Sequence, residues 1–517
     1  MMRKMTKTTV PVLLVLLGAT SRSRESERPK QPAFEFPATG VAARGNAVLL
    51  AIDDMLLPLR HGVCDYLSKP TVRREPVLTP SRDNKAAPDH FGTHFYGSVL
   101  AENGKFRMWY YPVSPGESPT DLGQGPVCYA ESPDGLRWTK PNLGQVEFRG
   151  SRANNAIRLP EAKIEGVEVI RDDDDPDPQR RYKMVYNPHN GKTWTIQTAT
   201  SPDGIRWTPR PDFAMDWFVE QASFIRHNGL YIVHGQALSY SEGGARGGRQ
   251  GYAWVSPDFS RWLPASAAAF LLPEPANPAD RGGNKPYDQV HLGVGAASFG
   301  NVAVGLYGLW HQRGWGEGGT SCDLGLVVSN DGMHFREPVK GRVYLSTSDS
   351  PVTPLPGKNF PTILCQANGI LNVGDETRIY HGRWRNAEYG AEYYAEVALA
   401  TLPRDRWGAV GLVPGAKEGS VWSAPVKLPA GGCRVSLNAD GVEGISVEVT
   451  DEQFRPLDGF GGTARGTAAA PGLDCPVKWS RGKVAALGGK TVRLHVQFRR
   501  TGAVEPRLYA VYLRGQG

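Results

Sequence analysis

The sequence predicts an all-β protein: a five-bladed β-propeller followed by a C-terminal β-sandwich. Three observations support this fold class. A turn motif recurs along the chain, alternating strand patterns precede its copies, and the tail has alternating strands without the motif. Hydrophobic residues make up 40% and charged residues 21% of the chain, with many glycines and prolines, which suits an ordered protein rich in turns.

The turn motif begins with Ser-Pro-Asp-Gly and ends on an aromatic residue. It stands at 132–138 and 201–207, in modified form at 256–262 and 329–335, and in a degenerate copy at 402–407. Proline fixes φ, aspartate bonds neighbouring backbone N–H groups and glycine takes positive φ, so the motif predicts a tight turn. The copies start about 55 to 73 residues apart, which is typical of a repeat architecture. We expect the aromatic residue to pack between neighbouring repeats.

Strand patterns lie upstream of each turn. Polar and apolar residues alternate in the runs 105–110, 181–186, 230–233, 302–307 and 377–380. Period-two alternation predicts strands, and five copies of strand–strand–strand–turn–strand predict five blades. The expected blades cover 90–145, 155–210, 215–268, 285–340 and 358–412. The apolar segment 47–59 is expected to complete the last blade, because an open ring leaves strand edges unpaired.

The ends of the chain differ from the middle. Residues 1–20 predict an export signal, since Arg3, Lys4 and Lys7 precede an apolar run too short to span a bilayer. Residues 21–44 are expected to be a linker, 45–412 the propeller, 413–430 a second linker and 431–517 the sandwich. We therefore expect an exported protein, periplasmic or extracellular, without a membrane span.

Charge and cysteine content exclude several functions. The net charge of +7, from 59 basic and 52 acidic residues, is a weak excess for this length. No dense basic run is interleaved with aromatics, so no nucleic-acid partner is expected. Cys433 and Cys475, in one terminal region, are the expected disulfide pair. No cysteine or histidine cluster has zinc spacing, and no cofactor is expected; the acidic loop Asp172–Asp175 leaves a structural calcium ion as an alternative.

The entry of each blade's first strand is the expected place for a site. In a propeller these strands surround a central channel, so residues at their entries converge on one pocket. The segments are 89–100, 164–170, 219–231, 287–291 and 366–369.

These features carry a family resemblance. The five repeats and the tail resemble the five-bladed glycoside hydrolases of the β-fructosidase family 32 and the arabinosidase/xylosidase family 43, and also exported bacterial proteins with the same propeller and tail. In family 43 a general-acid glutamate opens the blade-three strand, and the string from Glu220 to Phe224 is similar. The segment beginning at Glu165 is similar in position to an aspartate element that opens blade two. The family's blade-one aspartate would fall near Tyr96, and the nearest upstream carboxylate is Asp89.

The resemblance implies hydrolysis of an oligo- or polysaccharide by carboxylate acid/base catalysis. Glu220 would be the acid, Asp89 the base or nucleophile, and Glu165 a modulator that raises the acid's pKa by like-charge repulsion. The expected substrate-binding residues are Asp288 (also a reserve carboxylate), His291, Trp217, Gln366 and Asn368. The alternative is a non-catalytic propeller that binds a glycan or a protein, in which these residues only hold loops and blades together.

Overall fold

The computed structural model describes residues 33–116, 122–210, 220–238, 249–264, 289–311, 314, 316–385, 392–502 and 504–516. The expected export signal therefore lies outside the described residues. The protein is all-β, and the only helices within the described ranges are four short 3-10 turns, η1 (Pro178–Arg180), η3 (Val442–Gly444), η4 (Gly462–Ala464) and η5 (Val484–Leu487).

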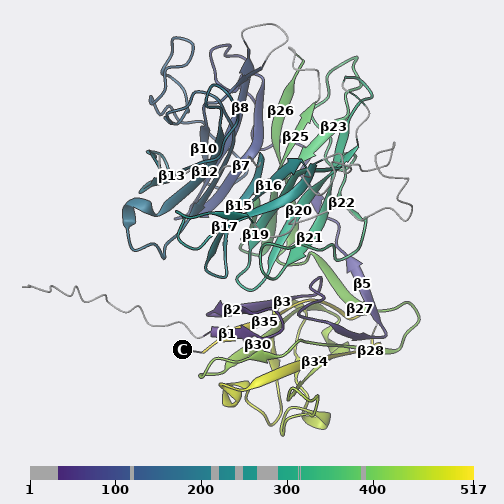
Figure 1. Ribbon diagram of the computed structural model, residues 1–517. Coiled ribbons are helices and arrows are strands. Elements are labelled where there is room, and N and C mark those ends of the chain that lie inside the picture. Colours follow the sequence, from purple (N-terminus) through teal and green to yellow (C-terminus); the bar gives the residue numbers. More distant parts are fainter. Residues whose placement is uncertain are drawn as a thin grey trace, which may run out of the picture. The chain divides into compact units, whose positions relative to one another are not determined.

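One group of strands occupies residues 71 to 403 (Figure 1). It consists of successive sets of antiparallel strands, most of which pair with the next strand along the chain. The sets are β7 (Gly92–Glu102), β8 (Lys105–Pro115), β9 (Leu122–Gln124) and β10 (Cys128–Ser132); β11 (Ile164–Arg171), β12 (Tyr182–Pro188), β13 (Gln197–Ser201) and β14 (Thr208–Pro209); β15 (Glu220–His227), β16 (Leu230–Leu238), β17 (Arg249–Ser256) and β18 (Leu263–Pro264); β19 (Gln289–Ser298), β20 (Ala303–His311), β21 (Ser321–Ser329) and β22 (Val343–Leu345); and β23 (Thr362–Cys365), β24 (Ile370–Val373), β25 (Glu376–Arg385) and β26 (Tyr394–Pro403).

The turn motif folds as the sequence predicts. Asp134 Oδ1 accepts the backbone N–H groups of Leu136 and Arg137 at 2.8 and 2.9 Å, and Gly135 has a φ of +75°. Aspartates 203, 258 and 331 make the same pair of bonds in the other copies. The motif is therefore a repeated local structure.

These turns also join neighbouring sets of strands. The indole N–H of Trp109 on β8 donates to the carbonyl oxygen of Gly204, in the turn of the following set, at 2.9 Å. The hydroxyl of Tyr380 on β25 donates to the carbonyl oxygen of Gly135, in the turn of the first set, at 2.8 Å. A hydrogen bond from a strand to a turn therefore joins the last set to the first, just as one joins the first set to the second.

The segment that adds to the last set is not the one expected. Strand β6 (Thr71–Val72) pairs with β26, and Leu78 bridges Val397 on the same strand. The expectation that residues 47–59 fill this position is wrong. Strand β3 (Asn46–Leu50) pairs instead with β35 (Arg507–Gly515). Its last four residues are all buried: Ala47 and Leu49 belong to the core that includes Val511, and Val48 and Leu50 to a core that includes Val304 and Trp407.

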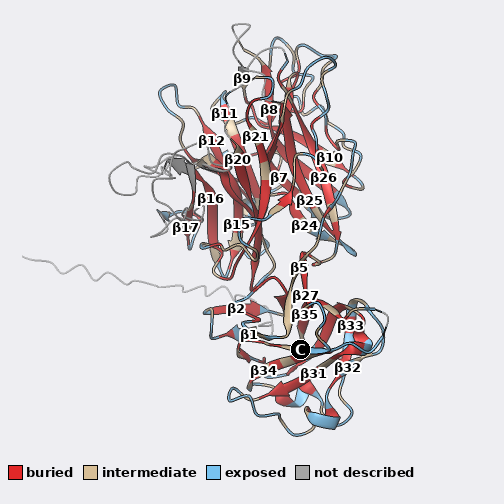
Figure 2. Cartoon of the chain, turned by 90° about the vertical axis from the view of Figure 1, so that its right-hand side faces the viewer, coloured by how far each residue is buried: buried red, intermediate tan, exposed pale blue. Residues whose placement is uncertain are grey.

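The remaining strands form two seven-stranded sheets that share one core. The first contains β1 (Ala33–Phe36), β2 (Val41–Arg44), β4 (Leu59–His61), β28 (Glu418–Trp422), β29 (Val426–Lys427), β31 (Ile445–Thr450) and β34 (Thr491–Arg499). The second contains β3, β5 (Val63–Leu67), β27 (Gly408–Leu412), β30 (Cys433–Asp440), β32 (Thr467–Ala468), β33 (Gly472–Lys478) and β35. In Figure 2 the strands of the first group are coloured mostly as buried, whereas those of the two seven-stranded sheets are a mixture of buried, intermediate and exposed residues.

Two stretches expected to be linkers contribute strands to these sheets. Residues 33–44 form the β1–β2 hairpin, and β28 and β29 lie within 413–430. The expected Cys433–Cys475 disulfide is absent: both thiols are free, with Cys475 opposite Leu437 and Cys433 opposite Gly515 in the sheet. All six cysteines lie in the described part of the chain and none is paired.

Candidate functional site

The first strand of each set is interrupted at a similar level near its start. The β-ladder register shifts between His94 and Ser98, between Ile164 and Val167, between Gln221 and Ser223, and between His291 and Val294. In the last set, residues 366–369 separate β23 from β24. Bulges turn side chains out of the regular alternation and are common beside active sites. The interruptions therefore mark a candidate site.

The interruptions lie against one another. A Cβ atom on Gly166 would stand 3.4 Å from the side chain of Gln221, so the residues next to Glu165 and Glu220 are in contact. Gly293 has a φ of +75°, and a Cβ there would meet the carbonyl oxygen of Gly235 at 2.4 Å. A side chain at 293 would force the strands apart, because this approach is closer than real Cβ contacts allow.

Aromatic and imidazole rings line this region. We call the following residues the aromatic cup: His94, Tyr96, Tyr111, His291, Trp310, Trp384 and Tyr393. The His94 ring centroid is 4.4 Å from that of Tyr96 and 5.1 Å from that of Trp384. The ring centroids of His291 and Trp310 are 4.5 Å apart. All seven residues are buried, with 2 to 6% of their surface exposed, so the cup is a packed group of rings.

Tyr96 connects the cup to two carboxylates. Its hydroxyl oxygen lies 3.3 Å from Nε2 of His291. Burial is the main cause that raises the pKa of Tyr96 well above its ordinary value, and the negative charges of Glu220 and Glu165 raise it further. The pKa of this hydroxyl group therefore responds to the charge of both carboxylates.

Glu220 is held in place and remains half-exposed. It is the first residue of β15, opposite Gln236 on β16, and the Gln236 amide donates a hydrogen bond to its carboxylate. The other end of that amide accepts the backbone N–H of Leu292 at 2.6 Å. The carboxylate therefore has a fixed position and access to solvent, as an acid/base group requires.

Glu165 is half-exposed within the bulge of β11, whereas its neighbour Glu168 is fully buried. Glu168 Oε2 accepts the Ser98 hydroxyl at 2.8 Å, and burial raises the pKa of this carboxyl well above its ordinary value. Of the two, only Glu165 is accessible to a ligand.

Asp89 does not join this group of contacts. It is buried, its carboxylate lies 2.6 Å from the ammonium group of Lys140, and it accepts the Tyr110 hydroxyl at 2.7 Å. A carboxylate already paired inside the protein is poorly suited to attack or deprotonate a substrate.

The amides of Gln366 and Asn368 bind the backbone of neighbouring strands. Gln366 donates to the carbonyl oxygens of His291 and Gly293 at 2.6 and 2.8 Å. Asn368 bonds both the N–H and the carbonyl of Phe224, at 2.9 and 2.7 Å. These contacts give the two residues a structural role beneath the cup. Among the other expected binding residues, His291 lies in the cup, and Asp288 and Trp217 lie outside the described residues.

Two cup residues outside the expected catalytic and substrate-binding set, His94 and Trp384, have a notable property. His94 Nδ1 and Trp384 Nε1 are buried and have no hydrogen-bond partner among the described residues. Buried polar atoms normally have partners, and exceptions call for an explanation. The only signal for His94 was its position in the strand-entry segment, and Trp384 is distant in the sequence.

The acidic loop considered for calcium is neutralised by the protein itself. The ammonium group of Lys183, which is fully buried, lies 2.7 Å from Asp175 and 3.2 Å from Asp172. Arg226 pairs with Asp172 as well. In the described part of the chain, no three histidine, cysteine or acidic side chains are grouped to hold a metal ion.

Three buried histidines make stability depend on pH. Burial lowers the pKa of His94 to about 3, of His234 to about 4 and of His381 to about 3. Unfolded histidine titrates near pH 6.5. Below that pH the unfolded chain binds protons that the folded chain does not, so the stabilisation present above pH 6.5 is lost as the pH falls.

We therefore expect the free energy of unfolding to decrease from about pH 6.5 to 4.5, approaching roughly 4 kcal/mol per pH unit if all three histidines contribute fully. Urea denaturation across this range measures the slope. The variant His94→Phe should lower the slope by about one proton. Equal stability at pH 7 and pH 5 would contradict the expectation.

The fold and the cup together define an all-β protein in which a buried group of aromatic rings lies beside two partly exposed carboxylates. No family model matches the chain. Two sequence relatives, both uncharacterized proteins from strains of Mycobacterium tuberculosis, are 29% identical over 112 residues, which is 22% of this chain. The aligned region covers 32% of the length of these relatives.

Solved structures provide a second comparison. A glycosyl hydrolase from Bacteroides ovatus is 15% identical with a TM-score of 0.43, and the alignment covers 66% of this chain and 95% of that one. A beta-1,2-mannobiose phosphorylase from Listeria innocua, in complex with beta-1,2-mannobiose, is 14% identical with a TM-score of 0.42, covering 66% and 96%. Within the described ranges, no helix has the length and apolar character needed to cross a bilayer.

Proposed function

We propose that the protein is an exported glycoside hydrolase built on a five-bladed β-propeller with a C-terminal β-sandwich. Support for the propeller comes from the five successive strand sets and from the contact between Tyr380 in the last set and the turn of the first. The N-terminal strands β1 to β5 would complete the sandwich, since they pair with strands after residue 407.

The proposed chemistry rests on one observation: the partly exposed glutamates Glu220 and Glu165 adjoin two residues that touch each other, Gln221 and Gly166, beside the aromatic cup. Glu220 would donate its proton to the glycosidic oxygen as the bond to the anomeric carbon breaks. Glu165 takes the second role in place of Asp89, because Asp89 is paired with Lys140. It would either remove a proton from the attacking water or bond to the anomeric carbon first.

The cup would position the sugar. Its buried rings would form the base beside which the two glutamates are set, and the sugar would bind at the partly exposed carboxylates. Oligo- or polysaccharide is therefore the proposed substrate class.

A screen of the wild-type protein against a glycan library, with product release followed by mass spectrometry, tests the proposal. We expect turnover of at least one glycan, and a loss of about 100-fold or more in Glu165→Gln on the same substrate. Product stereochemistry, measured by NMR, shows which role Glu165 takes. Binding of a glycan in the cup without turnover of any library member would favour a non-catalytic glycan-binding propeller.

A further inference from the structure

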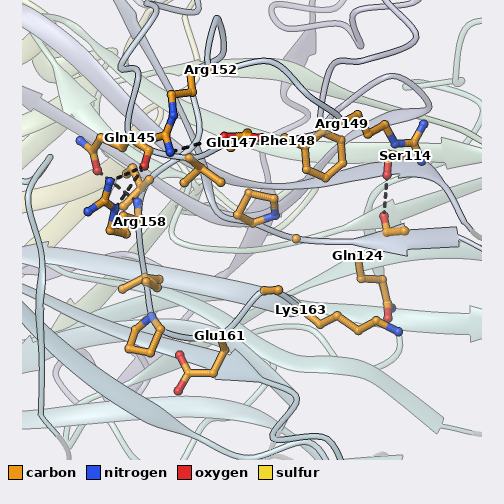
Figure 3. A pocket seen from close by; sticks show the side chains of 18 of the residues that line it. Ser114, Gln124, Gln145, Glu147, Phe148, Arg149, Arg152, Arg158, Glu161 and Lys163 are labelled. Carbon is orange, nitrogen blue, oxygen red and sulfur yellow. Dashed lines mark hydrogen bonds and ion pairs between the residues drawn. The ribbon is translucent and has the colours of Figure 1, made fainter.

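A second pocket lies on the same strand ends as the cup and is lined by basic side chains (Figure 3). Its volume is about 630 Å³. Ser114, at the end of β8, is three residues beyond Tyr111 of the cup, and Lys163 is two residues before Glu165. Since a strand rises about 3.3 Å per residue, the two sites are separated by roughly 7 to 10 Å along the chain.

The charged residues that line this pocket are unbalanced. The cations are Arg149, Arg152, Arg158 and Lys163, and the carboxylates are Glu147 and Glu161, so the lining carries four positive and two negative charges. Figure 3 shows Lys163 and Glu161 on one side and Arg152 and Arg158 on the other.

The acidic side chains of the protein do not neutralise these four cations. Arg149 and Arg158 donate to carbonyl oxygens, which fixes the loop but leaves the positive charge uncompensated. Arg152 is 56% exposed and lies 3.6 Å from Glu147, a loose ion pair. Lys163 is exposed, and no other described residue pairs with its ammonium group.

We propose that this basic pocket binds an anionic substituent of the glycan, a uronate carboxylate or a sulfate ester, while the cup holds the sugar ring to be cleaved. The inference rests on the proposed function and narrows its substrate class to acidic glycans. Arginine and lysine are the side chains that recognise such oxyanions, and arginine does so with a planar pair of donors. Attraction between exposed charges weakens with salt, so affinity should fall as ionic strength rises.

Binding to the Glu220→Gln protein tests the proposal without requiring turnover. The probes are tetragalacturonate, its fully methyl-esterified form, in which every charge is removed, and a sulfated tetrasaccharide with its desulfated form, all titrated by calorimetry. We expect a charged probe to bind at least tenfold more tightly than its neutral form. Comparison of the two charged probes then shows whether the pocket prefers a carboxylate or a sulfate ester.

Variants at the edge of the pocket locate the interaction. Arg152→Gln and Lys163→Gln, added to Glu220→Gln, should each weaken binding of the charged probe about fivefold and leave the neutral probe unchanged. Lys340→Gln, at an exposed lysine outside the pocket, is the matched control and should have no effect. The proposal is overturned if the charged and neutral probes bind equally, or if neither charged probe binds. It is also overturned if both variants bind the charged probe as tightly as the parent protein does. If charged probes bind in this way and no glycan is cleaved by the wild type, the pocket stands and the hydrolase assignment fails.

Discussion

Replacing Glu220 by glutamine is expected to lower kcat/KM on a natural glycan by about 10² to 10⁴, the usual contribution of a positioned acid or base. Glutamine keeps the shape of the side chain and can still bond the Gln236 amide, but it has no proton to give to a leaving oxygen. Steady-state kinetics of the purified variant measures the loss.

The same variant separates proton donation from a structural role. An aryl glycoside with a strongly acidic phenol as leaving group needs little protonation, so Glu220→Gln should lose far less activity on it. Glu131→Gln is the matched control, because Glu131 pairs with Lys105 beside a turn at the other end of the strands. If Glu220→Gln keeps full activity on the natural glycan, Glu220 is not the acid.

Replacing Lys183 by methionine is expected to lower the free energy of unfolding by about 3 to 5 kcal/mol, as when one partner of a buried ion pair is removed. The ammonium group is fully buried between Asp172 and Asp175 and also donates to the carbonyl oxygen of Arg180 at 2.9 Å. Its removal leaves carboxylates with little access to water. Urea denaturation at pH 7 measures the change.

A matched pair of variants shows whether burial is the cause. Lys105→Met removes a lysine from an exposed pair, with Glu131 at 2.9 Å, and should cost less than about 1 kcal/mol. Adding Asp175→Asn to Lys183→Met should recover part of the lost stability, since it removes one of the unpaired charges. If Lys183→Met and Lys105→Met lower the free energy of unfolding equally, burial of the ion pair does not increase its contribution to stability.

The parts of the fold that depend on local sequence could be predicted. The turn motif needs only neighbouring residues, so its Asp134 bonds and the positive φ of Gly135 followed directly from the string. The partner of β3 could not be predicted, because Leu49 pairs with Val511 across nearly the whole chain. The alternation of polar and apolar residues gave no indication that the side chain of Lys183 is buried. The loop at 172–175 covers this side chain and supplies its charge partners.

In the candidate site, too, features set by local sequence could be predicted and features set by distant residues could not. Position at a strand entry predicted that Glu220 and Glu165 lie in one region, and their neighbours Gln221 and Gly166 are in contact. The same rule failed to show that Asp89 turns inward to Lys140, because sequence does not give side-chain direction. The cup brings His94 next to Trp384 and Tyr393, and no local pattern connects residues so far apart.

The pairing of β3 with β35 has a consequence for biosynthesis. A ribosome makes Asn46–Leu50 early and Arg507–Gly515 almost last, so the first strand waits for its partner during nearly all of translation. Ala47 and Leu49, which pack among the C-terminal strands, stay uncovered through that period, whereas Val48 and Leu50 can pack earlier against residues such as Val304 and Trp407. A chain cut short before residue 507 would leave this strand without its partner, and quality-control proteases should remove it.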